Sequence, residues 1–301
     1  MPTQTPELGR RKSRREEREA ATRQRRWVVL GGSAIVLVLV GLVVARVLIS
    51  AGGPAPAPDS PAPDDLVAKV TSIPTASLEQ VGVGSVTTLP VAVRADVHRD
   101  PSGLPLVTYI GAEYCPYCAA ERWPLIIALS RFGTVSSLWL SHSATNDVDP
   151  NTPTFTLAHA SYSSHYLALS AVELTTNVPT ANGYQPLQTP TPAQRSLLDT
   201  YDAPPYVRGS GGSIPFIDFA GQYIVSGASF DVGLLRNMSQ EQVAAALADT
   251  STPQANAILG SANTKIAAMC SATGDNPIDV CGQPTVKSIE ARLAAEPVPG
   301  R

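Results

Sequence analysis

The sequence predicts a mixed α/β domain that is carried outside the cytoplasm by one N-terminal transmembrane helix. An apolar, β-branched and aromatic segment over 104–110 is typical of a buried strand. It is followed by a Cys-x-x-Cys motif, Cys115 to Cys118, and then by apolar residues at helical spacing up to Gly133. A second pair of strands separated by a Gly turn is expected over 213–225.

The transmembrane prediction rests on an uncharged run of 18 residues, 28–45. Its length approaches the roughly 20 residues that a helix needs to cross a bilayer. A cleavable signal peptide is the alternative, but such peptides have a shorter apolar core followed closely by small residues, whereas Arg46-Val47-Leu48-Ile49 follows here. We therefore expect an uncleaved anchor over 27–49, and either interpretation places the later chain outside the cytoplasm.

Charge is distributed unevenly around this run. Nine of the 22 basic residues but only four of the 25 acidic residues fall in 1–26, so the rest of the chain is net acidic. A basic segment before a membrane helix favours a cytoplasmic N-terminus, which explains the basic cluster without nucleic-acid binding. We expect a tail over 1–26, a Pro/Ala-rich linker over 50–64, and an extracytoplasmic domain over 65–301 in a single-pass protein of the cell membrane.

Further elements are predicted along the domain. The patterns favour a short helix over 65–70, turns over 78–89, a strand near 91–93 and a second buried strand over 137–141. Strand-like segments over 154–159 and 166–175 are separated by Ser161 to Ser164, and a short helix is expected over 193–201. The predicted helices near the C-terminus span 231–248, 253–269 and 285–294.

The position of the Cys-x-x-Cys motif predicts dithiol redox chemistry. At a helix N-terminus, unpaired amide N–H groups and the helix dipole favour an anion, so the first thiol can ionise below its usual pKa. We expect Cys115 to be the exposed nucleophile and Cys118 the buried thiol that resolves the mixed disulfide. Pro116 is tolerated in the first turn.

The other two cysteines favour a structural role. Cys270 and Cys281 lie far from the motif, and their spacing is unlike common zinc-ribbon patterns, so no metal site is predicted. Outside the cytoplasm this pair is expected to form a structural disulfide. A second exchange pair that relays electrons to or from Cys115 and Cys118 is the alternative.

The combination of a strand, Tyr114-Cys115-Pro116-Tyr117-Cys118 opening a helix, and Ser213-Ile214-Pro215 opening a hairpin resembles the thioredoxin superfamily. The run from Ala112 to Trp123 is similar to a membrane-anchored thioredoxin-like family catalogued as of unknown function. The resemblance covers roughly 85–247. It implies a thioredoxin-like fold with an insertion of about 145–206 between the Cys-x-x-Cys helix and the hairpin, and a C-terminal helical extension of about 231–301.

The resemblance also implies roles for further residues. Ile214 and Pro215 match the position where the superfamily has a cis-proline that faces the active site and a preceding residue that binds substrate. Glu113, Glu121 and Arg122 flank the motif. They are candidates for tuning the thiolate, and solvation on the helix surface is the alternative.

The expected function is thiol–disulfide exchange on cysteine-containing secreted or cell-envelope proteins, with a membrane redox partner resetting the dithiol and no organic cofactor. The motif does not distinguish an oxidase, a reductase and an isomerase. A non-catalytic binding module with the same fold and a thiolate metal chaperone remain the alternatives.

Overall fold

The computed structural model describes residues 59–208 and 211–298, which all belong to one compact unit. The predicted tail over 1–26, the predicted membrane helix over 27–49 and most of the predicted linker lie outside these residues. In the described ranges, no helix is both long and apolar enough to cross a membrane.

A five-stranded mixed sheet forms the centre of the domain. Its spatial order is β2 (Val91–Ala92), β12 (Tyr223–Ser226), β11 (Phe216–Phe219), β3 (Leu106–Gly111) and β8 (Ala168–Glu173). Strands β3 and β8 are parallel, whereas β11 is antiparallel to both β3 and β12. β3 is buried along nearly its whole length because helices cover both faces of the sheet, and this explains its continuous apolar sequence.

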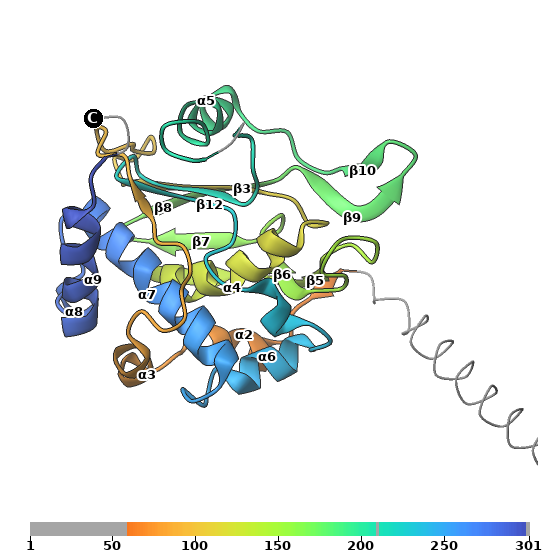
Figure 1. The fold of residues 1–301 in the computed structure, drawn as a ribbon, viewed down its shortest axis with the longest axis horizontal. Coiled ribbons are helices and arrows are strands. Elements are labelled where there is room, and N and C mark those ends of the chain that lie inside the picture. The colour runs from red at the N-terminus through yellow and green to blue at the C-terminus, as the bar shows by residue number, and fades with distance from the viewer. Residues whose placement is uncertain (1–58, 209–210, 299–301) are drawn as a thin grey trace, which may run out of the picture. The chain divides into compact units, whose positions relative to one another are not determined.

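Helices pack on the two faces of this sheet (Figure 1). One face carries α5 (Pro192–Tyr201), which packs near Ile110 and Phe216. The other face carries α4 (Pro116–Ser130) and α7 (Pro253–Thr273), with Val107, Tyr109 and Ile217 in their core. The side chains of β3 therefore alternate between two cores, as the strand geometry requires.

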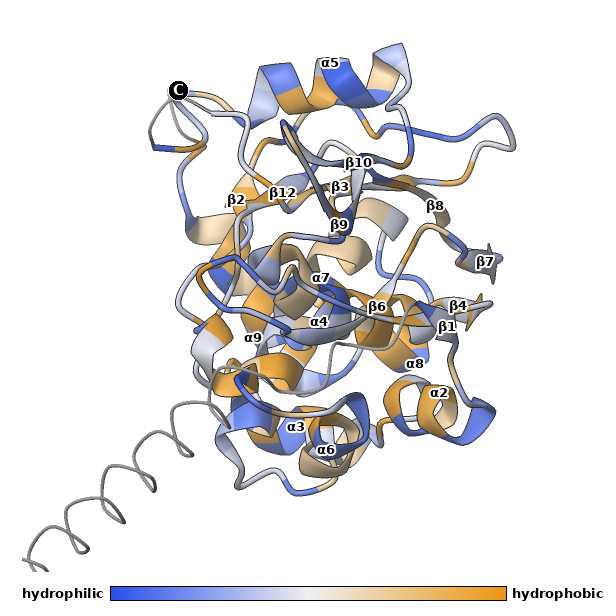
Figure 2. Ribbon diagram, turned by 90° about the vertical axis from the view of Figure 1, so that its right-hand side faces the viewer, coloured by the Kyte–Doolittle hydropathy of each residue, from blue (hydrophilic) through white to orange (hydrophobic). Residues whose placement is uncertain are grey.

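Smaller helices surround this larger core. They are α2 (Asp64–Thr71), α3 (Thr75–Val81), the 3₁₀ helix η1 (Val232–Leu235), α6 (Gln240–Ala246), α8 (Ile278–Cys281) and α9 (Pro284–Ala295). Figure 2 shows both hydrophilic and hydrophobic residues on the outer helices α2 and α5, as expected for helices with one buried side.

The remaining strands form three small sheets beside the central one. They are β1 (Ser60–Pro61), β4 (Gly133–Ser136), β5 (Trp139–His142), β6 (Pro153–Thr156), β7 (Ser161–Ser164), β9 (Thr175–Thr180) and β10 (Gly183–Pro186). They pair as β1-β5-β6, β4-β7 and β9-β10.

Several expectations change in the structure. The strand predicted over 137–141 is present as β5 but lies in a small sheet, and only its Ser141 is buried. Ser161 to Ser164 form β7 rather than a separator, because this segment pairs with β4. Ser60 and Pro61, assigned to the linker, pair with β5, so the folded domain begins before residue 65.

Two further differences have local causes. The first residues of the turns expected over 78–89 belong to α3, which ends at Val81 and is followed by the C-cap Gly82 with a positive φ of 61°. The helix expected over 231–248 is interrupted between η1 and α6, where Asn237 has a φ of 61° and Ser239 starts α6 with a capping box.

The predicted insertion of about 145–206 contains β8, which is a strand of the central sheet. Along the chain, the segment between α4 and the next strand of the central sheet is therefore the one with β4 to β7. The hairpin β9–β10 and α5 come after β8. Sequence periodicity does not show which of several short strands joins the main sheet, because that choice depends on long-range pairing.

Candidate functional site

The Cys-x-x-Cys motif lies where β3 gives way to α4. Cys115 is the N-cap residue of α4, and its Sγ accepts a hydrogen bond of 3.3 Å from the backbone N of Cys118. Pro116 occupies the first turn, where a missing N–H leaves no partner unsatisfied. The thiol thus takes the place of the Ser, Thr or Asp side chain that usually caps a helix.

The structure corrects the expected exposure of Cys115. Its side chain is only 4% exposed, and Cys118 is fully buried. The carbonyl of Ile214 lies 3.7 Å from Cys115 Sγ, which can donate its proton to it. The loop before β11 therefore covers the first thiol, and this packing between distant segments could not be predicted from the motif.

The Ile214–Pro215 peptide bond is cis, as the resemblance implies. Ile214 faces Cys115, and the carbonyl of Pro215 accepts a hydrogen bond of 2.8 Å from the backbone N of Gly227. This second contact joins the loop to the segment after β12.

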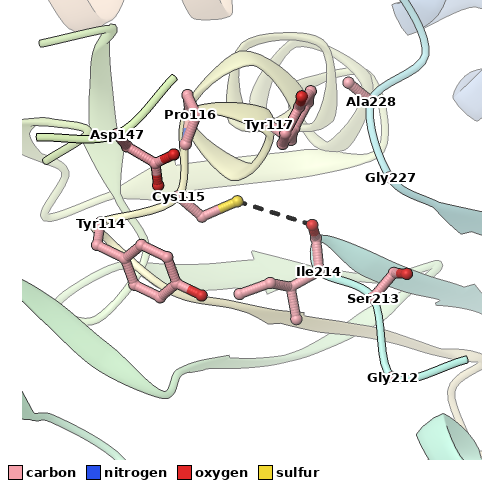
Figure 3. A pocket seen from close by; sticks show the side chains of 10 residues that line it. All are labelled: Tyr114, Cys115, Pro116, Tyr117, Asp147, Gly212, Ser213, Ile214, Gly227 and Ala228. Atoms are coloured by element: carbon pink, nitrogen blue, oxygen red, sulfur yellow. Dashed lines mark hydrogen bonds between the residues drawn. The ribbon is translucent and has the colours of Figure 1, made fainter. Parts of the chain in front are cut away.

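An open groove of about 500 Å³ runs past Cys115 (Figure 3). It is lined by Tyr114, Cys115, Pro116, Tyr117, Asp147, Gly212, Ser213, Ile214, Gly227 and Ala228. Figure 3 shows the Cys115 sulfur between the Asp147 and Tyr114 side and the Ile214 and Ser213 side. Although Cys115 has little exposed area, it is one of the residues that border this groove.

The surroundings give the two thiols opposite tendencies to ionise. Hydrogen bonds from the Cys118 side chain and backbone, together with the charge of Arg122, lower the pKa of Cys115 against the opposing effect of burial. Burial raises the pKa of Cys118 well above its ordinary value, and the hydrogen bond to Cys115 adds to this. Cys115 is therefore the thiol that ionises first.

Arg122 lies in the core and not on a solvated helix surface. Its guanidinium binds the Glu173 carboxylate through Nε at 2.8 Å and Nη2 at 2.6 Å, and both side chains are fully buried. Nη2 also donates to the carbonyl of Ala112 at 2.8 Å. Arg122 thus links α4, the end of β3 and β8 beneath the motif.

Glu113 is also buried, with 3% of its surface exposed. Its Oε1 accepts a hydrogen bond of 2.6 Å from Thr156 Oγ1. Burial raises the pKa of Glu113 to about 7 from its ordinary value of 4.5, with smaller contributions from the charges of Asp59 and Glu173. A carboxyl group with this pKa can hold or release a proton near neutral pH, two residues before the nucleophile.

Glu121 forms a second buried ion pair. Its Oε2 lies 2.6 Å from Lys265 Nζ on α7, and its Oε1 accepts the backbone N–H of Ser229. Lys265 also donates to the Ser229 hydroxyl at 3.2 Å. The pair holds the segment next to Gly227 and Ala228, which line the groove. Surface solvation, the alternative for all three flanking residues, is therefore wrong.

The distant cysteines form a disulfide, Cys270–Cys281, with 5.5 Å between their Cα atoms. Both residues are fully buried, and the bond joins the end of α7 to α8. Cys115 and Cys118 are unbonded thiols. Among residues 59–208 and 211–298, no group of three or more His, Cys, Asp or Glu side chains is placed to hold a metal ion.

Sequence patterns did not indicate several side chains around the site. Glu173 and Lys265 come from β8 and α7 and neutralise charges on α4. Asp202, at the end of α5, accepts hydrogen bonds from the backbone N of Ser213 and, at 2.5 Å, from Ser226 Oγ. The one available signal was a charged residue within an apolar pattern, as for Lys265 in α7 and Glu173 at the end of β8.

A family model described as a domain of unknown function, DUF929, matches residues 97–271, more than half of the chain. The match includes the Cys-x-x-Cys motif, the cis-proline loop and Cys270. No curated protein and no solved structure matches the chain.

Proposed function

The chain belongs to the DUF929 family of proteins with a domain of unknown function, and we propose that it is a membrane-anchored thiol–disulfide oxidoreductase acting on secreted or cell-envelope proteins. The single observation that carries the proposal is the placement of Cys115. Its thiol caps α4, contacts the Ile214 carbonyl at 3.7 Å and borders an open groove.

The same geometry supports a thioredoxin-like fold as part of the proposal. Strand β3 leads into the Cys-x-x-Cys helix, and β3 is parallel to β8. The antiparallel hairpin β11–β12 follows the cis Ile214–Pro215 bond, and the Ile214 carbonyl contacts Cys115. The segment from β4 to β7 and the C-terminal helices are additions to that arrangement.

The proposed reaction has two exchange steps. The Cys115 thiolate attacks one sulfur of a substrate disulfide, forming a mixed disulfide, and the other substrate sulfur leaves as a thiolate that takes up a proton. Cys118 then loses its proton and attacks Cys115 Sγ. This releases the second substrate thiol and leaves a Cys115–Cys118 disulfide. The reverse sequence oxidises a substrate dithiol.

The neighbouring groups support this order of events. Hydrogen bonds from Cys118 and the charge of Arg122 stabilise the Cys115 thiolate. The high pKa of Cys118 keeps its proton in place until the mixed disulfide has formed. Glu113, two residues before Cys115 in the chain, has a pKa that suits transfer of that proton.

The location outside the cytoplasm comes from the basic tail and the apolar run in the sequence. A membrane redox partner is proposed to return the dithiol to its starting state. The direction, oxidation or reduction, depends on the reduction potential of the Cys115–Cys118 pair, and measuring this potential against glutathione assigns it.

Trapping tests the proposal. A full-length Cys118→Ala variant retains the nucleophile but cannot resolve the mixed disulfide, so it should accumulate covalent adducts with envelope or secreted proteins. These adducts should disappear on reduction and be absent from a Cys115→Ala/Cys118→Ala variant. A folded Cys118→Ala protein without adducts, and without reaction toward small disulfides, would rule the proposal out.

A further inference from the structure

The groove beside Cys115 has an uneven charge distribution. Among residues 59–208 and 211–298, ten line it, and Asp147 is the only one of these with a charged side chain, apart from any thiolate at Cys115. Figure 3 shows the Asp147 carboxylate next to Pro116 and Cys115, on the side of the groove that Tyr114 shares. The opposite side consists of Gly212, Ser213 and Ile214.

Within the described ranges, the Asp147 carboxylate has no cationic partner. Its Oδ1 accepts a hydrogen bond of 2.7 Å from the backbone N of Val148, and no Lys, Arg or His nitrogen of these ranges forms an ion pair with it. Asp149, two residues later, does have such a partner, because its Oδ1 lies 2.6 Å from Arg236 Nη2. Of these two carboxylates, the one that has no ion-pair partner in the described part of the chain lines the groove.

The segment that carries Asp147 is attached to the motif at two points. The backbone N of Ala144 donates to the carbonyl of Tyr114 at 2.8 Å. Tyr184, from the β9–β10 hairpin, stacks on Tyr114 with 4.2 Å between ring centroids and an angle of 8° between the planes, and its hydroxyl donates to Asn146 Oδ1 at 3.0 Å. The carboxylate is therefore held next to a pair of aromatic rings.

A carboxylate beside aromatic rings suits one class of side chain. Lysine and arginine bind carboxylates by charge and hydrogen bonding, and their cationic groups also pack against aromatic faces. An acidic residue in the same position would be repelled. On the other side of the groove, Gly212 and Gly227 have positive φ values of 77° and 78°, and a Cβ at either would meet nothing within 4 Å. The backbone at these two positions therefore borders open space.

We propose that Asp147, Tyr114 and Tyr184 form a subsite for a lysine or arginine next to the reacting cysteine of the substrate. This subsite selects basic cysteine-containing segments from the proteins that reach the domain. It rests on the proposed exchange activity of Cys115 and adds a substrate class to it.

The test uses disulfides that differ in charge. The reduced full chain is mixed at low salt with short peptides, each carrying one cysteine as a mixed disulfide with the same leaving thiol and with Arg, Ala or Glu as the adjacent residue. The rate of leaving-thiol release is measured for each peptide. Dividing the Arg rate by the Glu rate cancels the reactivity of Cys115 itself, including any effect of a substitution on its pKa.

The wild-type ratio of Arg to Glu rates is expected to be about 5- to 20-fold, given the size of exposed ion pairs and cation–π contacts. It should fall toward 1 in Asp147→Asn, invert in Asp147→Lys and decrease in Tyr184→Ala. The matched control Asp149→Asn, whose carboxylate is paired with Arg236, should keep the wild-type ratio. Higher salt should reduce the ratio in the wild type, because surface charges are screened.

The outcomes separate the two proposals. If the wild type reacts with all three peptides and Asp147→Asn has the same ratio as the wild type, the subsite is wrong and the exchange activity stands. If the wild type reacts with none of the peptides, the exchange activity fails and the subsite with it.

Discussion

Cys115 and Cys118 belong to the same helical turn, yet their surroundings make them chemically different. Cys115 borders the groove and accepts the backbone N–H of Cys118, so its anion is stabilised. Cys118 has no contact with solvent, and burial disfavours its anion. A difference of one pKa unit corresponds to about 1.4 kcal/mol between protonation states, so these opposite shifts favour ionisation of Cys115 over Cys118.

At the residue scale, Glu113 predicts a pH dependence of stability. Its pKa is about 7 in the folded protein and 4.5 ordinarily, so the folded state binds the proton more tightly. The stabilising contribution is complete below pH 4.5 and is lost as the pH rises through about 7, since the ionised carboxylate is then buried. We expect Glu113→Gln to remove this loss and to stabilise the protein at pH 8 by on the order of 2 kcal/mol.

The measurement is the unfolding midpoint of both proteins from pH 4 to pH 9. The two curves should separate above pH 5, with the wild type falling more steeply. The same substitution should slow the resolving step near neutral pH if Glu113 accepts the Cys118 proton. Parallel curves over the whole range would show that Glu113 does not titrate as described.

At the scale of elements, the Arg122–Glu173 pair connects α4 to β8. Removing one member of a buried ion pair leaves an uncompensated charge, which typically costs about 3–5 kcal/mol. We expect Arg122→Met to destabilise the domain by about this amount and to raise the pKa of Cys115, because the Arg122 charge lowers it.

The double variant Arg122→Met/Glu173→Leu supplies the comparison. Its loss of stability should be clearly smaller than the sum of the losses in Arg122→Met and Glu173→Leu, because neither charge is then buried without a partner. Denaturant unfolding gives the stabilities, and the pH dependence of Cys115 alkylation gives its pKa. Additive losses would mean that the two side chains act independently.

Asp202 connects α5 to the loop that faces Cys115. It is 1% exposed, its carboxylate accepts from Ser213 N and Ser226 Oγ, and its carbonyl accepts from Gly212 N at 3.1 Å. Asp202→Ala removes the acceptor of two part-buried hydrogen bonds, at a cost of about 1 kcal/mol each. Because the loop contacts substrate in the proposal, exchange with peptide disulfides should slow more than exchange with a small disulfide.

This ratio of peptide to small-disulfide rates distinguishes positioning from a general loss of stability. Asp202→Asn, which keeps one acceptor oxygen, should restore part of this rate ratio. The pKa of Cys115 should stay at the wild-type value in both variants. An equal slowing of both reactions would assign Asp202 to stability alone.

At the scale of the whole domain, α7 lies between the groove and the disulfide. Its Lys265 binds Glu121 of the motif helix, and its Cys270 is bonded to Cys281. Closing a loop of this size stabilises a fold by about 3 kcal/mol on the chain-entropy estimate. Cys270→Ala/Cys281→Ala should therefore lower the melting temperature and leave the rate of exchange at Cys115 unchanged. Unchanged stability with lost turnover would instead assign the pair to electron relay.

Much of the element order was predictable from local patterns. The strand before the motif, its helix, the hairpin over 216–226 and the helix that became α7 were all expected near their observed positions. Each has a strong local signal, such as the apolar run of β3 or the Gly221 turn between β11 and β12. The pairing of β8 with β3 and the break before α6 were not predicted, because both depend on distant partners or on a single backbone conformation.

The sequence by itself determined the motif, its position at a helix start, the pairing of Cys270 with Cys281 and the candidate facing residue Pro215. The motif and its place at a helix start follow from spacing and local capping rules. The disulfide was expected from the cysteine spacing and the predicted compartment, and the facing position of Pro215 was implied by the family resemblance. Only the tertiary structure decided that Cys115 is nearly covered and that Glu113, Glu121 and Arg122 are buried. It also brought Asp147 to the groove and Tyr184 against the groove residue Tyr114. The physical reason is that burial and ion pairing are set by segments from β8, α5 and α7, which lie 50 or more residues away from the motif in the chain.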